Sequence, residues 1–199
     1  MEHKNENHTM RVFYLLAIVF VVDGHTTLGN LFDFNGLFRY YSFHLMMFAF
    51  GSGYFFKFYG GLRADIAHRA KKLLVPLYLW NAVYGAGAAL LRRFGGFELG
   101  EPLSAYTLLL APLTDGQHFI WNLGAWFIFP LFLVQVFYAA IRRLSKLWHE
   151  NEVMTFLLCL IPGCAAVQLC FHGRQDALPL FLLRPMILLP GFAGGQLYR

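Results

Sequence analysis

The sequence predicts an all-α fold, a polytopic transmembrane helix bundle of about six spans, and three observations support this prediction. Hydrophobic residues make up 58% of the chain and charged residues only 14%, against roughly 25% charged residues in soluble domains. The apolar residues form blocks long enough to cross a bilayer, not short amphipathic periods. Basic residues stand at the ends of these blocks, where they fix the orientation of membrane helices.

A polar lead at residues 1–10 precedes six apolar blocks, and we assign one membrane span to each block. The predicted spans are residues 11–32, 40–58, 73–91, 121–141, 153–171 and 178–198. The first two spans are joined by a short turn at residues 33–39 and must run antiparallel. Residues 11–199 therefore form one transmembrane domain, with both ends of the chain on the same side of the membrane.

The distribution of basic residues predicts which side this is. Eleven of the 16 Lys and Arg residues lie on the predicted side of the chain ends and four on the other side. The densest cluster falls in residues 60–72, which we expect to form a loop. Lys and Arg next to a span resist translocation. We therefore expect a multi-pass protein of the cell membrane (inner or plasma membrane) whose N-terminus, 60–72 loop and C-terminal end face the cytoplasm.

Several other classes of protein do not fit. The net charge of +5 does not indicate a nucleic-acid partner, because the basic residues are not gathered on one amphipathic face. Cys159, Cys164 and Cys170 share one apolar block, so we interpret them as packing residues and expect no disulfide framework, no metal and no bound cofactor. The absence of an internal repeat weakens an inverted-repeat transporter interpretation.

Two histidines lie toward the predicted outer ends of the first two spans, His25 and His44. Ionisable groups at membrane depth are costly and usually line a polar cavity. Because an imidazole titrates near neutral pH, it can take a proton from a hydroxyl group and return it. Since the two spans are antiparallel, the histidines can approach each other. The residues alone leave open that both are structural, hydrogen-bonded across helices or packed at the interface.

Arg69 and Lys72 are three residues apart at the start of the third span, so a helix places them on one face. Such clusters bind phosphate through charge and, for Arg, forked hydrogen bonds. A topology signal or a contact with anionic lipids remains an alternative. Arg11 precedes His25 by close to four helical turns, on the same face and about 21 Å away. Arg184 lies inside the sixth span, where it binds an anionic or polar group or pairs with an acid on a neighbouring span.

Four sequence blocks, taken together, have a recognisable order and spacing. They are the first span ending in His25, FHLMMFAFGSGYFF at residues 43–56, RAKKLLVP at residues 69–76 and WFIFPLFLV at residues 126–134. They are distributed across most of the chain, and together they resemble the acyltransferase-3 family. The resemblance implies an integral membrane enzyme that moves an acyl group, commonly acetyl, from cytoplasmic acyl-CoA to a hydroxyl of a cell-surface glycan or related acceptor.

The resemblance also implies roles for individual residues. His25 matches the span-one histidine required for transfer, and His44 matches the histidine of the family's F-H-x-P-L-F-F-F-x-S-G block. Arg69 and Lys72 match the cytoplasmic R-x-x-R motif that would hold the phosphates of the donor. The catalytic candidates are therefore His25 and His44. The substrate-binding candidates are Arg69 and Lys72, together with Arg11 and Arg184, which are selected by their positions in the first and sixth spans.

The sequence departs from the family pattern at three points. Tyr14 stands where the family commonly has an arginine, and Met46 replaces a proline. Lys72 replaces the second arginine of the motif and loses the bidentate fork. The family has about ten spans of membrane-crossing length, so we expect this chain to be the N-terminal part of such an enzyme. A non-catalytic or transport role, or an inactive relic of the family, remains an alternative.

Overall fold

The computed structural model describes residues 7–25, 43–98, 100–114, 116, 119–147 and 151–199. The all-α prediction is confirmed, since these residues form helices and no β-strand. In chain order the α-helices are α1 (His8–His25), α2 (His44–Tyr54), α3 (Leu62–Arg69), α4 (Val75–Gly95), α5 (Ile128–Lys146), α6 (Glu152–Phe171) and α7 (Leu180–Tyr198). Shorter helical segments are η3 (Ala70–Leu74), η4 (Tyr106–Leu110), η5 (Ala111–Leu113), η6 (Ile120–Phe127) and η7 (Gln175–Ala177).

Four helices in the described part of the chain are long and apolar enough to cross a membrane: Leu62–Gly95, Gly124–Lys146, Glu152–Phe171 and Leu180–Tyr198. They coincide with the third to sixth predicted spans. The first predicted span corresponds to α1, with 18 residues. A helical backbone is expected here because a bilayer offers no partner for unpaired N–H and C=O groups.

The second predicted span, residues 40–58, is helical only in part. α2 has 11 residues, which corresponds to about 16 Å of rise. The helix ends at Tyr54 because the chain then turns so that the Phe56 ring enters the core. Residues 26–42, which contain the end of the first predicted span, the predicted turn and the start of the second span, lie outside the described residues.

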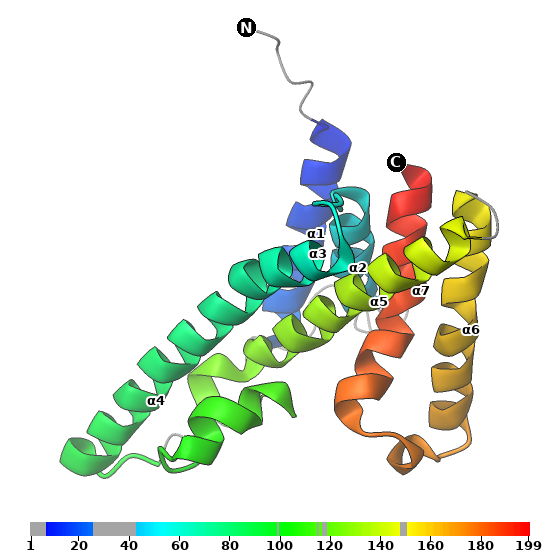
Figure 1. Ribbon diagram of the computed structural model, residues 1–199. Helices are drawn as coiled ribbons and strands as arrows, with labels where there is room; N and C mark the ends of the chain where they lie inside the picture. The colour runs from blue at the N-terminus through cyan, green and yellow to red at the C-terminus, as the bar shows by residue number, and fades with distance from the viewer. Residues whose placement is uncertain (1–6, 26–42, 99, 115, 117–118, 148–150) are drawn as a thin grey trace, which may run out of the picture.

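The basic segment 60–72 is helical from Leu62 onward, which corrects the prediction of a loop. α3, η3 and α4 follow one another without a break, and η3 is a π-helical turn within this long helix. Figure 1 shows the start of α1, α3, the end of α5, the start of α6 and the C-terminal end of α7 at one end of the bundle. The far end of α4 and the α6–α7 connection lie at the opposite end, as the six-span prediction requires.

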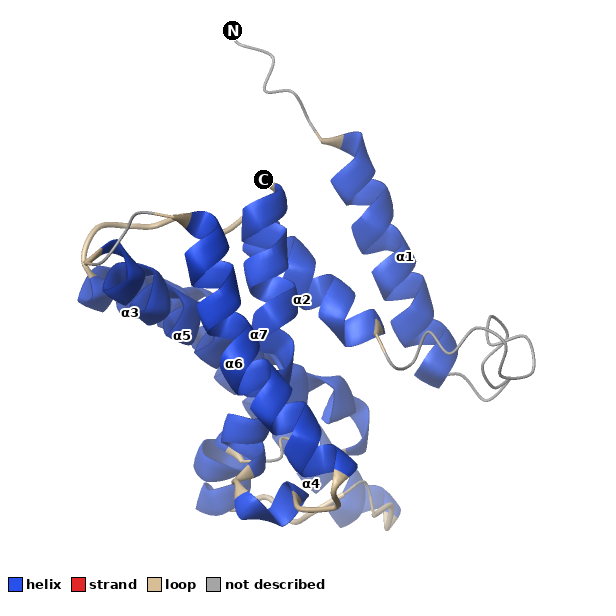
Figure 2. Ribbon diagram, turned by 90° about the vertical axis from the view of Figure 1, so that its right-hand side faces the viewer, coloured by secondary structure: helices blue, strands red, loops and turns tan. Residues whose placement is uncertain are grey.

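α7 is the central helix of the bundle, in contact with α2, α5 and α6. Figures 1 and 2 show α7 between α2 and α6. Three rings form the middle of the core, since Phe56, Tyr138 and Phe192 have centroids 5.2–5.3 Å apart. The Cys159 thiol is buried against this core, in agreement with a packing role, whereas Cys164 is exposed.

The backbones of α2 and α7 approach each other closely at two glycines. A Cβ atom on Gly53 would meet the carbonyl oxygen of Phe192, and one on Gly195 would meet the carbonyl of Phe50 and lie 2.9 Å from the Tyr54 nitrogen. Small residues at such crossings are typical of helix packing in membranes.

Gly195→Ala is therefore expected to destabilise the protein by about 1–3 kcal/mol, because backbone atoms cannot yield to the added methyl group. The matched control is Gly87→Ala in α4, where the added Cβ meets open space and alanine is the better helix former. Thermal unfolding in neutral detergent should show a lower Tm for Gly195→Ala and an unchanged or higher Tm for Gly87→Ala. Equal Tm values would contradict the close approach of α2 and α7.

Candidate functional site

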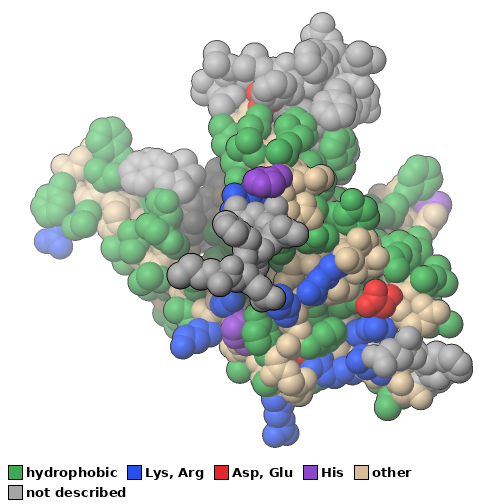
Figure 3. Space-filling model, turned by 90° about the horizontal axis from the view of Figure 1, so that it is seen from above, with side chains coloured by type: hydrophobic (Ala, Val, Ile, Leu, Met, Phe, Trp, Pro, Cys, Tyr) green, Lys and Arg blue, Asp and Glu red, His purple; other side chains and the backbone are tan. Residues whose placement is uncertain are grey.

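Basic side chains gather on the face of the bundle at which α1 begins and α7 ends, here called the basic face. Viewed from that side, several Lys and Arg side chains lie among hydrophobic and other side chains, whereas few acidic side chains are visible (Figure 3). They come from the end of α2, from α3 and η3, from the last turns of α5, and from the end of the chain. Arg92 and Arg93 are in the last turn of α4, at the opposite end of the bundle. The basic face is the natural place to look for an anion-binding site.

A pocket of about 230 Å³ opens on the basic face, and we call it the polar pocket. It lies between α1, α2, α5 and the α3–η3 segment. Its polar lining includes Tyr14, Ser52, His68, Arg69, Lys72 and Gln135. The structure thus brings Arg69 and Lys72 into one pocket, together with Tyr14, the residue that stands where the family pattern has an arginine.

Arg69 is held in a fixed position, with only 4% of its side chain exposed. Its Nη1 donates to the carbonyl of Asp65 at 2.9 Å and its Nη2 to the carbonyl of Lys57 at 2.8 Å. The guanidinium also lies 4.1 Å from the centre of the Phe56 ring. Lys72, by contrast, is exposed. The π-helical turn begins directly after the buried Arg69 and contains the exposed Lys72, and such turns are frequent at functional sites.

Two buried polar atoms of the polar pocket have no hydrogen-bond partner among the described residues, Nε of Arg69 and Nε2 of His68. The His68 ring is stacked on Tyr59 with centroids 3.7 Å apart. A buried nitrogen without a partner costs free energy unless a ligand or water satisfies it. The polar pocket therefore has the character of a binding site and not of a sealed structural cluster.

Asp65 is the centre of the ion-pair network beside this pocket, and sequence reasoning did not select it. The Asp65 side chain is 1% exposed. Its carboxylate forms ion pairs with Arg69, at 3.1 Å, and with Arg143 of α5. It also accepts a hydrogen bond from the backbone N–H of Tyr59 at 2.7 Å. Arg143 also donates to the carbonyl of Gly60 at 2.7 Å. The sequence feature that could have identified Asp65 is its position four residues before Arg69 in the densest basic segment, which is the spacing of a helical ion pair.

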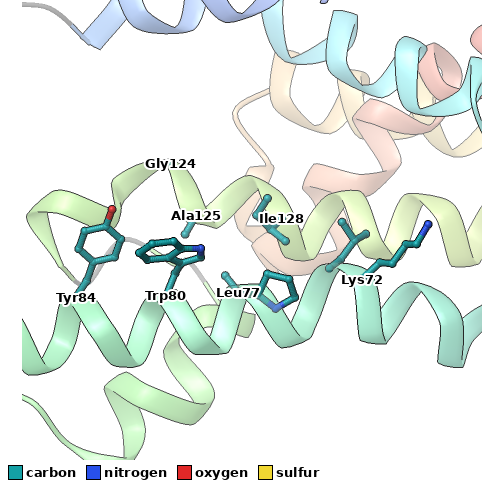
Figure 4. A pocket seen from close by; sticks show the side chains of 9 residues that line it. Lys72, Leu77, Trp80, Tyr84, Gly124, Ala125 and Ile128 are labelled. Carbon is teal, nitrogen blue, oxygen red and sulfur yellow. The ribbon is translucent and has the colours of Figure 1, made fainter.

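A second, apolar groove of about 420 Å³ begins where the polar pocket ends, since both are lined by Lys72 and Leu73. Figure 4 shows Lys72 at one end of this groove and Trp80 and Tyr84 toward the other end, with Gly124 and Ala125 across from them. The Trp80 and Tyr84 rings are 5.9 Å apart. A cationic mouth followed by an aromatic groove suits a ligand with an anionic head and an apolar arm.

The catalytic candidates lie away from the basic face. α1 and α2 are antiparallel, as predicted, because Phe13 contacts Phe50 and Phe20 contacts Phe43. His44 is buried at the start of α2. His25 is the last residue of α1, about 8 Å beyond Phe20 along the helix axis, and its side chain lies outside the described residues. Neither the polar pocket nor the apolar groove is lined by His44.

The two further arginine candidates occupy different environments. Arg11 is exposed in α1, one turn before Tyr14. Arg184 is half-buried in α7, and its guanidinium lies 4.3 Å from the centre of the Trp126 ring. A cation–π contact of this kind stabilises a cation away from water. Neither arginine lines the polar pocket.

Comparison with known proteins agrees with the sequence blocks. Residues 12–199 match the family model Acyl_transf_3, described as an acyltransferase domain. Comparisons with curated proteins and with solved structures find no match. Because the family model covers nearly the whole chain, and because the described helices form a bundle with membrane-spanning apolar helices, this chain belongs to the acyltransferase-3 family and is a membrane acyltransferase domain.

Proposed function

We propose that the protein transfers an acyl group, typically acetyl, from acyl-CoA to a hydroxyl group of a cell-surface carbohydrate or a related acceptor. The observation that best supports this proposal is the polar pocket, where buried nitrogens of His68 and Arg69 lack partners beside an exposed Lys72. The apolar groove continues from it. A cationic pocket followed by an apolar groove matches the order of the phosphates, the pantetheine arm and the acyl group along the donor acyl-CoA.

In the proposed complex, Arg69 and Lys72 hold donor phosphates at the basic face. Arg69 is already oriented by Asp65 and Lys57, so little conformational entropy is lost when a phosphate binds. Lys72 supplies an exposed ammonium group, a point charge that adapts to the phosphate. The thioester arm then follows the groove past Trp80, which removes apolar surface from water.

The acceptor is proposed to bind toward the opposite end of the bundle, where α1 ends at His25. There the His25 imidazole takes the proton of the acceptor hydroxyl, whose oxygen attacks the thioester carbonyl. The C–S bond breaks, the ester forms, and the proton passes to the departing thiolate. We propose His44 as a second catalytic group and Arg11 and Arg184 as contacts for polar or anionic parts of the substrates.

The proposed orientation follows from the chemistry of the donor. Acyl-CoA is available in the cytoplasm, and a basic face on that side agrees with the positive-inside rule. We therefore propose that the basic face and both described chain ends lie on the cytoplasmic side of the cell membrane, and that the acceptor is reached from the other side.

Lys72→Gln is expected to raise the KM for acyl-CoA by about tenfold or more, since a charge-assisted phosphate contact is lost. Lys72 is exposed, so folding should be unaffected, and Lys72→Arg, which restores the forked donor, should keep or lower the KM. The measurement is the formation of acylated acceptor, or hydrolysis of radiolabelled acyl-CoA, in membranes that contain the protein.

The matched control is Lys71→Gln, which removes the neighbouring exposed charge but no group that lines the polar pocket. Its KM should equal that of the unmodified protein. An equal rise in the KM for acyl-CoA in the two variants would indicate that Lys72 contributes only general positive charge and no specific phosphate contact. Membranes with neither acyl-CoA hydrolysis nor transfer to any hydroxyl acceptor would overturn the proposed function.

A further inference from the structure

A third pocket, separate from the polar pocket and the groove, lies among the ends of α5, α6 and α7 on the basic face. Its volume is about 460 Å³, and we call it the interhelical pocket. Four basic side chains and a single carboxylate line it, namely Lys57, Arg142, Lys146, Arg199 and Glu152. It shares only Phe56 and Lys57 with the polar pocket.

Arg142 forms the buried end of this pocket, and its guanidinium is only partly neutralised. The residue is 6% exposed, and its Nη1 donates to the Thr155 hydroxyl at 3.2 Å. Its ion-pair partner Glu152 is 3.6 Å away and 52% exposed. A charge-assisted N–H···O contact is normally 2.7–2.9 Å long, so this carboxylate compensates the buried charge incompletely.

The wall of the interhelical pocket is organised around Arg142. The Ser145 and Thr155 hydroxyls are 2.8 Å apart and connect α5 to α6 beneath it. Arg199 donates to the carbonyl of Phe56 at 2.9 Å. Gln196 contributes an amide oxygen that is buried without a hydrogen-bond partner among the described residues. Exchange of the amide O and N positions would turn this atom into a donor directed at an anion.

We infer that the interhelical pocket binds a phosphate group, with Arg142 at its base and Lys146 and Arg199 at its rim. A phosphate offers several acceptor oxygens for these donors. It also supplies negative charge to compensate Arg142, which Glu152 compensates only in part. Basic pockets between the ends of transmembrane helices are typical sites for anionic lipid headgroups. A soluble phosphate has the same chemistry, and the experiment separates these two sources.

The test titrates two ligands into the protein purified in neutral detergent and follows the rise in Tm, which ligand binding to the folded state produces. The ligands are short-chain phosphatidylglycerol and inorganic pyrophosphate, with phosphatidylcholine of the same acyl chains as the lipid control. Lys146→Gln/Arg199→Gln removes two exposed charges of the pocket rim. Arg63→Gln/Lys71→Gln removes two exposed charges of the same face that do not line the pocket.

The rim variant should require about 30-fold more ligand for the half-maximal Tm shift, while the Arg63/Lys71 variant behaves like the unmodified protein. A shift by phosphatidylglycerol alone identifies a lipid headgroup, and a shift by pyrophosphate that the rim variant loses identifies a soluble phosphate. Lys146→Arg/Arg199→Lys, which keeps both charges, should retain binding and shows that folding is intact. Equal losses in both double Gln variants, equal shifts by the two lipids, or no shift by either ligand would overturn the inference.

Discussion

Asp65→Asn is expected to lower the stability of the protein by about 3 kcal/mol, the largest single effect on folding that we predict. The substitution keeps the shape of the side chain but removes the charge that faces Arg69 and Arg143. The Arg69 side chain is 4% exposed and that of Arg143 is 27% exposed. Two guanidinium groups would remain near each other, one of them without access to water. Thermal unfolding in neutral detergent measures the loss as a drop in Tm.

A double variant tests whether the loss of stability in Asp65→Asn comes from the uncompensated charges of Arg69 and Arg143. Adding Arg143→Gln to Asp65→Asn should recover part of the lost Tm, because one of the uncompensated cations is removed. Asp176→Asn, at an exposed acid in η7, should change stability by no more than about 0.5 kcal/mol. A double variant less stable than Asp65→Asn alone would show that the network is not organised around the Asp65 charge.

His25→Ala is expected to lower kcat for acyl transfer by about 10²- to 10⁴-fold, the contribution typical of a general base. Because the residue is at the end of α1, the substitution should leave the Tm and the KM for acyl-CoA close to those of the unmodified protein. The measurement is the rate of acceptor acylation at saturating acyl-CoA in membranes that contain the protein. Retained kcat would remove His25 from the catalytic role.

The matched control for this substitution lies on the same helix. His8→Ala changes an exposed histidine at the first residue of α1, on the basic face, and should leave kcat unchanged. His44→Ala is a poorer test of catalysis, since His44 is buried and its loss creates a cavity that lowers stability as well. Equal losses of kcat in His8→Ala and His25→Ala would indicate a defect of α1 and not of the chemistry.

The general architecture could be predicted from hydrophobic length alone. A bilayer satisfies no backbone polar group, so long apolar blocks such as residues 153–171 form helices whatever their neighbours are, and α6 agrees with that range. The start of α1 and the end of α7 lie on one face, in agreement with the even number of predicted blocks. The four motif blocks were sufficient to identify the family, which the match over residues 12–199 confirms.

The candidate site was predictable only in part. The sequence selected Arg69 and Lys72, which line one pocket, but it gave no indication that their burial differs. In the structure Arg69 is buried against Phe56 and Lys72 is exposed. Sequence spacing gave no indication that Gln135 and Tyr14, from helices distant in the chain, complete the same pocket.

Apolar blocks and flanking basic residues are sufficient to specify a membrane helix bundle with a basic face, because membrane insertion depends on local hydrophobicity and charge. Three other features arise from the packing of the helices: Asp65 holds Arg69 and Arg143 together, α2 ends at Tyr54, and the basic face contains two distinct pockets. These features depend in part on contacts between residues far apart in the chain, 78 positions for Asp65 with Arg143 and 143 positions for Phe56 with Arg199. Such contacts form only when α5 and α7 pack against the N-terminal helices, and local sequence patterns do not predict that packing.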